Sequence, residues 1–307
     1  MVLPSLALAQ QKKASQPLKF GNPFGGRWDL TVTTPSETYP DWMLIDFSDC
    51  CMQAQIQPRT GSTVWVNNLH NEGNHLTFPF RDATWTLDLN GDKLTGTIKQ
   101  GDTVQAQLAG VRAPKLGHAD PRAWTNPEPL FNGKDLTGWE AFNPANNHWV
   151  VKDGVLVNEA KGSNLKTTRK FDDFKLHVEY NCPDNGNSGI FLRGRYEVQV
   201  EYEPSDANDK YHSIGSIYSF IPPRVALPRK PGQWESFDIT LVGRWVTVVR
   251  NGVKTIDAQE ILGITGGALD SNEVAPGPIY LQGDHTGGMM YRNITISVPR
   301  AAAARKK

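Results

Sequence analysis

Residues 185–201, Asn-Gly-Asn-Ser-Gly-Ile-Phe-Leu-Arg-Gly-Arg-Tyr-Glu-Val-Gln-Val-Glu, are the most informative segment of this chain. It predicts a turn, a strand, a two-residue break and a second strand. Side chains alternate between the two faces of a strand. One face of this pair therefore carries the apolar residues Ile190, Leu192, Tyr196, Val198 and Val200. The opposite face carries Phe191, Arg193, Glu197, Gln199 and Glu201. We expect that polar face to meet water or a polar ligand, because it does not suit an apolar layer.

Composition predicts an all-β protein without an overall charge. The 307 residues hold 32 Lys plus Arg and 32 Asp plus Glu, so no net field favours nucleic acid or an anionic membrane. Nine Trp, 28 Gly and 21 Pro, with little helical periodicity, are typical of short strands joined by turns. The basic residues at 300–307 are interpreted as a solvated tail.

The N-terminus resembles the end of a secretory signal. Residues 1–10 are mostly apolar, and Ala7-Leu8-Ala9 matches a small-residue cleavage site that would leave Gln10 as the first mature residue. We therefore expect a disordered segment over 1–20 and a periplasmic or secreted location. A plain apolar tail is the alternative, and the lack of a basic n-region leaves a start further upstream open. No stretch approaches the ~20 apolar residues of a transmembrane helix.

The three cysteines do not show from sequence alone whether the chain contains a disulfide. Cys50 and Cys51 are adjacent, so their side chains point to opposite strand faces, and one of them could bridge to Cys182. We expect either three small buried residues or one disulfide. No Cys and His spacing of a zinc site occurs.

A proline-rich linker over 113–129 separates two β-rich regions. Before it, residues 21–112 predict a small antiparallel β-barrel with Asn90-Gly91-Asp92 as a hairpin turn. Its Gly26-x-Trp28 motif resembles the opening of lipocalin-like barrels, although a Trp in an ordinary β core explains it equally well. We expect an accessory or ligand-contacting module. The strands predicted here are 26–32, 42–47, 51–57, 63–67, 84–89, 93–99 and 103–111.

Residues 130–299 predict a two-sheet jelly-roll sandwich. Asp153-Gly154 and Asn251-Gly252 are hairpin signals. No GxSxG, P-loop, HExxH or helix-opening GxGxxG motif occurs, which removes the common hydrolase and nucleotide-binding classes. The predicted strands are 148–151, 155–158, 164–167, 174–181, 189–192, 196–200, 236–242, 245–250, 279–282 and 290–298.

A series of ordered motifs over 130–299 resembles the 3-keto-disaccharide hydrolase domain family. The motifs include Leu130-Phe-Asn-Gly-Lys-Asp-Leu-Thr-Gly-Trp139, Gly186-Asn-Ser-Gly-Ile-Phe-Leu-Arg193, Tyr196-Glu-Val-Gln-Val200 and Gly277-Pro-Ile-Tyr-Leu-Gln282. The resemblance implies a concanavalin-A-like jelly roll that acts on 3-keto-glycosides in exported sugar-degrading systems. Where the family often continues with an apolar residue and Asp, this chain has Glu201-Tyr202, so any role of that Asp is absent or moved.

The implied chemistry differs from ordinary glycoside hydrolysis. A ketone at C3 acidifies the C2 proton, so a base can form an enolate, the C1–O bond can break by elimination, and water can add back. Such a site needs a base, a group that stabilises the enolate oxygen, and an acid for the leaving oxygen. We expect Glu197, His285 and Arg193 to be catalytic. Substrate-binding roles are expected for Glu179, Gln199, Asn187, Asp284 and Tyr218.

Several alternatives remain open at this point. No motif indicates a cofactor, and a divalent cation held by Glu and His side chains could polarise the ketone. A carbohydrate-binding module without catalysis would use the same fold. A retaining glycosidase would need Glu197 and Glu201 as its carboxyl pair, but strand rise separates their Cα atoms by roughly 13 Å. The oligomeric state is not indicated.

Overall fold

The computed structural model describes residues 22–47, 51–117, 121, 123–202 and 209–300. The predicted signal at 1–20, Cys50 and nearly all of the basic tail at 300–307 lie outside these residues. The described chain is built of strands, with a single 3-10 turn, η1 (Pro144–Asn146). This confirms the all-β prediction. None of the described residues forms a helix with the length and apolar character required to cross a bilayer.

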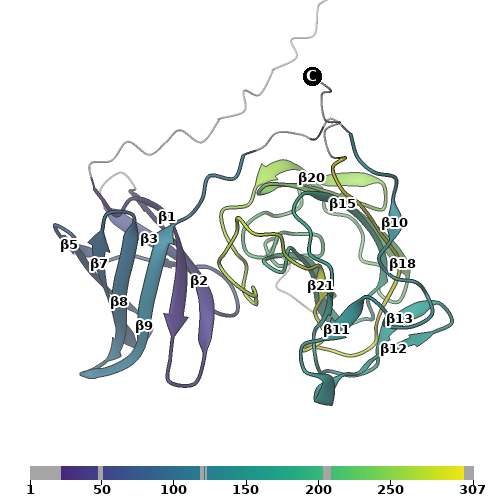
Figure 1. The fold of residues 1–307 in the computed structure, drawn as a ribbon, viewed down its shortest axis with the longest axis horizontal. Helices are drawn as coiled ribbons and strands as arrows, with labels where there is room; N and C mark the ends of the chain where they lie inside the picture. Colours follow the sequence, from purple (N-terminus) through teal and green to yellow (C-terminus); the bar gives the residue numbers. More distant parts are fainter. Residues whose placement is uncertain (1–21, 48–50, 118–120, 122, 203–208, 301–307) are drawn as a thin grey trace, which may run out of the picture.

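The first part of the chain forms one nine-stranded antiparallel sheet, ordered β4-β3-β2-β1-β9-β8-β7-β6-β5. The sheet curls until β4 contacts β6, which gives the small barrel-like shape seen on the left of Figure 1. Asn90 pairs with Lys93 around Gly91 at φ +61°, so the predicted hairpin is confirmed. Its strands are β1 (Gly26–Thr33), β2 (Thr38–Phe47), β3 (Met52–Gln57), β4 (Val64–Val66), β5 (His70–Glu72), β6 (His75–Phe80), β7 (Ala83–Asn90), β8 (Lys93–Gln100) and β9 (Thr103–Arg112).

The curled sheet has its own apolar core. Trp28 is fully buried there, its indole N–H donates to the carbonyl of Phe24 (2.8 Å), and the guanidinium of Arg112 lies 3.8 Å from its ring centroid. The alternating burial of β7 shows why the strand forms, because Trp85, Leu87 and Leu89 point inward while their neighbours are more exposed. Strands β5 and β6 were not predicted.

The rest of the chain forms two sheets packed face to face (Figure 1). One has the order β12-β13-β22-β15-β18-β19-β20 with β10 paired to β22, and the other is β11-β14-β21-β16-β17. This is the predicted jelly-roll sandwich. Its strands are β10 (Glu128–Pro129), β11 (Trp139–Ala141), β12 (Trp149–Lys152), β13 (Val155–Asn158), β14 (Leu165–Thr167), β15 (Phe174–Asn181), β16 (Asn187–Leu192), β17 (Tyr196–Glu201), β18 (Trp234–Val242), β19 (Trp245–Arg250), β20 (Val253–Glu260), β21 (Tyr280–Leu281) and β22 (Met289–Ser297).

Local turn chemistry fixes two of these hairpins. Asp153 and Gly154 both have positive φ between the paired residues Lys152 and Val155, and Asn251-Gly252 does the same between β19 and β20. Such turns match the twist of antiparallel strands. The apolar residues of β16 and β17 point into the core between the two sheets, so their polar neighbours point away from the sandwich.

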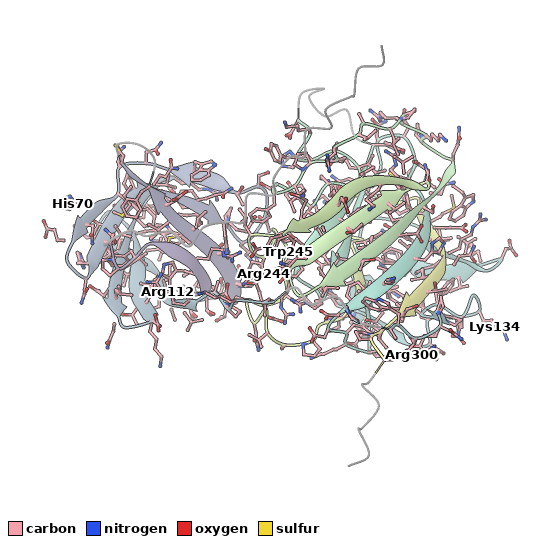
Figure 2. All side chains as sticks on the ribbon, turned by 90° about the horizontal axis from the view of Figure 1, so that it is seen from above. His70, Arg112, Lys134, Arg244, Trp245 and Arg300 are labelled. Atoms are coloured by element: carbon pink, nitrogen blue, oxygen red, sulfur yellow. The ribbon has the colours of Figure 1, made fainter. Side chains whose placement is uncertain are left out.

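The curled sheet packs against the sandwich through apolar and charged contacts. Trp42 of β2 belongs to the sandwich core and meets Phe220 edge-to-face, with ring centroids 5.4 Å apart. Arg27 of β1 forms an ion pair with Glu260 of β20 at 2.9 Å. Arg244, labelled between the two parts in Figure 2, is fully buried and forms a bidentate pair with Glu273. Each part has its own core, and we propose the predicted division into two domains on that basis.

The cysteines differ in their surroundings. Among the described residues, Cys182 is buried with a free thiol and Cys51 is exposed. The expectation that all three are buried is therefore wrong for Cys51. Burial raises the pKa of the Cys182 thiol to about 12, so this thiol stays protonated at neutral pH.

A buried carboxyl at the contact between the two parts should make stability depend on pH. Burial, and then the charge of Glu273 and a hydrogen bond to it, raise the pKa of Asp29 from 3.8 to about 8. Between these values the folded chain holds a proton that the unfolded chain has lost, so stability falls as pH rises through this window. We expect Asp29→Asn to raise the melting temperature most at pH 8 and progressively less toward pH 5, as measured by calorimetry.

The exposed turn residue Asp102 provides the control, since its carboxyl is solvated. Asp102→Asn should leave the melting curve of the wild type unchanged across the same pH range. Equal effects of the two substitutions, or an Asp29→Asn effect that does not vary with pH, would contradict this account of Asp29.

Candidate functional site

The outer face of the five-stranded sheet forms the floor of the site. Phe191 of β16 pairs with Glu197 of β17 on one side and Tyr280 of β21 on the other. The rings of Phe191 and Tyr280 stack 3.9 Å apart at 11°. Because directly opposed residues of an antiparallel pair share a face, the predicted polar face of β17 extends over β16 and β21. In this floor β16 lies between β17 and β21 and is hydrogen-bonded to both.

A cavity of about 390 Å³ lies over this floor. Most of its wall comes from the sandwich, but the loop between β3 and β4 of the curled sheet contributes as well. Its lining residues are Thr60, Gly61, Asn164, Asn187, Glu197, Gln199, Glu201, Asp209, His212, Tyr218, Gly266, Gly267, Tyr280, Gln282, Asp284 and His285. The volume and the polar lining suit a small polar ligand such as a sugar.

Glu197 is a buried carboxyl in this cavity, with 4% of its surface exposed. Its side chain lies over Gly189, where a Cβ would collide with the carboxyl, so the glycine makes room for it. Burial, and then the charges of Asp284 and Glu201, raise the pKa of Glu197 well above its usual value. Among the described residues, the carboxyl oxygens of Glu197 receive no hydrogen bond that would oppose this shift. A carboxyl in these surroundings can both take and give a proton near neutral pH.

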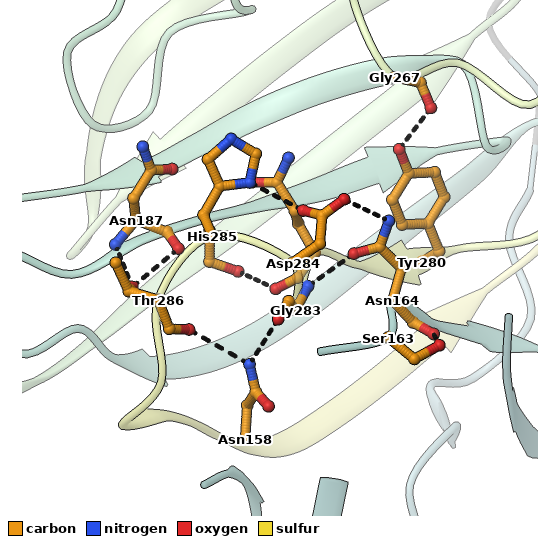
Figure 3. A network of polar contacts seen from close by, with 12 residues as sticks. Asn158, Ser163, Asn164, Asn187, Gly267, Tyr280, Gly283, Asp284, His285 and Thr286 are labelled. Atoms are coloured by element: carbon orange, nitrogen blue, oxygen red, sulfur yellow. Dashed lines mark hydrogen bonds and ion pairs between the residues drawn. The ribbon is translucent and has the colours of Figure 1, made fainter. Parts of the chain in front are cut away.

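Asp284 and His285 form a hydrogen-bonded pair at the cavity wall (Figure 3). The Nδ1 atom of His285 lies 2.7 Å from Oδ1 of Asp284, and the amide of Asn164 donates to Oδ2 at 3.3 Å. Burial raises the pKa of Asp284, but the hydrogen bonds from His285 and Asn164 and the charge of His285 bring it below its usual value. An ionised Asp284 therefore stands beside a carboxyl, Glu197, that favours its proton.

Two amide oxygens in the lining have no partner in the described part of the protein. They are Oε1 of Gln199, whose residue is 2% exposed, and Oε1 of Gln282. A buried acceptor that lacks a donor costs free energy. Sugar hydroxyls are donors of the required kind, and both oxygens belong to residues that line the cavity.

The expected position of Arg193 is wrong. Arg193 lies in the turn between β16 and β17 at φ +52°, so it does not continue the alternation of the strand. Its guanidinium is 1% exposed and donates to Asp172 (2.8 Å), to Tyr196 Oη (3.2 Å) and to the carbonyl of Glu273 (3.0 Å). It is not among the residues that line the cavity. The structure gives it a place in a buried polar network.

The expected position of Glu179 is also wrong. This residue belongs to β15 in the other sheet, on the face that points away from the sandwich core. There it accepts hydrogen bonds from Arg292 (2.6 Å) and Asn293 (2.7 Å). The strand at 174–181 was predicted correctly, but it lies in the sheet that does not carry the cavity.

The other predicted site residues come together at the cavity. Glu197, Gln199, Asn187, Tyr218, Asp284 and His285 all line it. Sequence reasoning missed Asn164, Asp209, His212, Tyr280, Gln282 and the loop residues Thr60 and Gly61. Tyr280 and Gln282 lie in a motif that the family resemblance had quoted, and the alternation of that strand would have placed both on one face. No sequence signal links the loop at 58–63 to residues beyond 200.

The donor set does not fit the divalent cation that the sequence left open. Within the described residues, no group of three or more His, Cys, Asp and Glu side chains gathers closely enough to hold a metal ion. Asp284 is already hydrogen-bonded by His285 and Asn164. We therefore derive no step through a metal.

Comparison with known proteins places the chain in a family. A model of the 3-keto-alpha-glucoside-1,2-lyase-like domain matches residues 126–297, which is more than half of the chain, so the chain belongs to this family. A 3-keto-disaccharide hydrolase of Bacteroides thetaiotaomicron is 28% identical over 96 residues, which are 28% of this chain and 32% of that relative. The chain thus spans about a third of the length of that curated relative.

Two solved structures from Parabacteroides distasonis, both of candidate glycosyl hydrolases, are similar to part of this chain. One is 32% identical and covers 59% of this chain and 93% of its own, with a TM-score of 0.48. The other is 22% identical and covers 57% and 94%, with a TM-score of 0.46. The match to the family model confirms the resemblance found over residues 130–299.

The burial of the Arg193 guanidinium predicts that this side chain stabilises the folded protein. Arg193→Met should lower the free energy of unfolding by about 3–5 kcal/mol, because it leaves the buried partners of the guanidinium unsatisfied. Urea unfolding followed by tryptophan fluorescence would measure this.

Arg169→Met is the matched control, because Arg169 pairs with Glu128 at the exposed surface (2.7 Å). It should change the free energy of unfolding by less than about 1 kcal/mol. An Arg193 variant as stable as the wild type would contradict the structural role.

Proposed function

We propose that this protein cleaves 3-keto-glycosides, and that Glu197 is the base that removes the C2 proton. One observation carries the proposal: a buried carboxyl with a raised pKa lies on the floor of a polar cavity beside two unpartnered amide oxygens. Membership of the 3-keto-alpha-glucoside-1,2-lyase-like family supports this class of substrate. The names of the relatives support an enzyme that acts on sugars.

The proposed reaction begins when the Glu197 carboxylate takes the C2 proton. The C–H electron pair forms an enolate with the C3 carbonyl, and the C1–O bond breaks as a double bond forms between C1 and C2. The leaving oxygen takes a proton from an acid at the site. Water then adds its oxygen to C1 and returns its spare proton to that acid, and C2 recovers a proton from Glu197. The net change is hydrolysis of the glycoside without an oxocarbenium intermediate. A base with a raised pKa suits this step, because the C2 proton is only weakly acidic.

Arg193 was expected to be catalytic, but its guanidinium is buried away from the cavity, so another group must stabilise the enolate oxygen. The His285–Asp284 pair takes its place in our proposal. The Asp284 carboxylate holds the imidazole through Nδ1, and the protonated form of this imidazole would place positive charge at the cavity wall. Charge that is fixed before the reaction stabilises an enolate more effectively than a group that must reorganise.

The amides of Gln199 and Gln282 would orient the sugar in this scheme. The side-chain amide of Gln199 donates to Glu201, which fixes its orientation and leaves Oε1 as an acceptor. Sugar hydroxyls would satisfy both acceptors. The stacked rings of Phe191 and Tyr280 form an apolar part of the same floor.

A substrate comparison tests the proposed function. A methyl 3-keto-glucoside and the unoxidised methyl glucoside are incubated separately with the protein, and released methanol is measured. We expect release from the keto sugar alone, since the unoxidised sugar has no acidified C2 proton. Glu197→Gln should lower this activity by at least about 10²-fold, and His285→Ala by about 10–10²-fold. Cleavage of the unoxidised sugar, or binding without turnover, would overturn the proposal.

The space at Gly189 provides a second test of Glu197. Gly189→Ala should reduce the keto-glycoside activity more than about 10-fold, because the added methyl group displaces the carboxyl and a small misplacement is costly. Gly117→Ala is the control, since open space surrounds that glycine. Both variants should keep the wild-type circular dichroism spectrum. Undiminished activity of Gly189→Ala would contradict the position assigned to Glu197.

A further inference from the structure

A chain of hydrogen bonds joins the curled sheet to the cavity. Ser62, in the loop between β3 and β4, places its Oγ 2.5 Å from Nε2 of His212. The Nδ1 atom of His212 contacts the carboxylate of Asp209. The Oγ atom of Ser62 also lies 3.5 Å from Oη of Tyr218. His212, Asp209 and Tyr218 all line the cavity that contains Glu197.

The Asp209 carboxylate fixes the orientation of the imidazole. A carboxylate at Nδ1 requires a proton on that nitrogen, so the Nε2 atom is directed to Ser62. The rings of His212 and Tyr218 lie 4.6 Å apart, which places the histidine directly against the tyrosine. The serine hydroxyl thus stands between an imidazole nitrogen and a phenol oxygen.

The loop that carries Ser62 is held firmly in place. The side-chain amide of Gln57 donates to the carbonyls of Pro58 and Gly61, and Gly267 donates its N–H to the carbonyl of Arg59 (3.0 Å). The next residue, Thr63, is bonded to Oγ of Ser219 through both its N–H and its hydroxyl, each at 2.9 Å. The bonds of Gly267 and Ser219 to this loop join the sandwich to the curled sheet.

Tyr218 is tied to the proposed base by its own backbone. Its N–H donates to the carbonyl of Glu197 at 3.0 Å. The phenol and the carboxyl therefore reach the same cavity from adjoining chain segments. An acid and a base at one cavity are what elimination across the C1–C2 bond requires.

We propose that Tyr218 protonates the leaving glycosidic oxygen, and that Ser62 and His212 relay a proton to Tyr218 from behind. This inference rests on the proposed function and assigns the acid of that reaction. It also makes the curled sheet part of the active site, since Ser62 belongs to it.

The proton transfers balance over one turnover. As the C1–O bond breaks, the departing oxygen takes the proton of Tyr218 Oη. The relay starts from a His212 that carries protons on both ring nitrogens: the phenolate takes the proton of Ser62 Oγ, and Ser62 takes the Nε2 proton of His212, which becomes neutral. When water adds to C1, its spare proton returns along the same chain to His212. Neither an oxidant nor a reductant is involved.

The surroundings of Tyr218 suit this role. Burial raises the pKa of its phenol, a hydrogen bond from Ser62 opposes that effect, and the carboxyls of Glu197, Glu201 and Asp209 raise the pKa further. The phenol therefore keeps its proton until the leaving oxygen gains negative charge. The 3.5 Å separation from Ser62 is typical of catalytic hydrogen bonds that shorten when substrate binds.

Leaving groups of different basicity test the proposal. Methyl 3-keto-glucoside releases a strongly basic alkoxide that needs an acid, whereas 4-nitrophenyl 3-keto-glucoside releases a weak base that does not. Tyr218→Phe should lower kcat/KM for the methyl glycoside by about 10²-fold or more and for the nitrophenyl glycoside by less than about 10-fold. Ser62→Ala should also lower kcat/KM more for the methyl glycoside than for the nitrophenyl glycoside, by a smaller factor than Tyr218→Phe. Ser62→Thr keeps a hydroxyl and should bring kcat/KM for the methyl glycoside back toward the wild-type value.

Ser219→Ala is the matched control, because it weakens the same contact between the sheets without breaking the relay. It should lower both activities equally or leave both unchanged. Equal losses on both glycosides in Tyr218→Phe, or an Ser62→Ala variant with wild-type selectivity, would overturn the relay while the proposed function stands. A wild-type protein that cleaves neither keto-glycoside overturns the proposed function and the relay together.

Discussion

The arrangement of the site depends on one constraint, the burial of a carboxyl group on the outer face of a sheet. Glu197 is almost fully covered although it points away from the sandwich core. It fits because Gly189 across the strand pair has no side chain, and because a loop from another sheet lies over the cavity. Burial raises the pKa of the Glu197 carboxyl. The packing that excludes water from this group therefore also makes it suitable for proton transfer near neutral pH.

The groups around Glu197 and Asp284 give these two carboxyls different protonation preferences. Asp284 is stabilised in its charged form by His285 and Asn164, whereas Glu197 is surrounded by groups that disfavour its charge. Two carboxyls at one cavity thus have opposite protonation preferences, which is a frequent basis for dividing acid and base roles. The side-chain oxygens of Gln199 and Gln282, which have no hydrogen-bond partner among the described residues, are acceptors for a ligand that donates hydrogen bonds.

The sequence predicted the architecture better than it predicted the site. The predicted strands at 174–181, 196–200 and 290–298 and the turns at Asp153-Gly154 and Asn251-Gly252 rest on local signals, and the structure confirms them. Arg193 was misplaced because a residue with positive φ ends the alternation, and Glu179 because alternation does not tell which sheet a strand joins. The contact between Ser62 and His212 joins positions 150 residues apart, and it depends on how two sheet systems pack.

The β3–β4 loop has a further consequence for how this protein can change. Thr60 and Gly61 form part of the cavity wall, yet they are carried by a sheet with its own apolar core. Replacements of Thr60 or Gly61 that keep Ser62 in place would reshape the cavity wall without repacking β16, β17 or β21. Selectivity among ligands can therefore diverge between related proteins, or be engineered, independently of the scaffold that supports the chemistry.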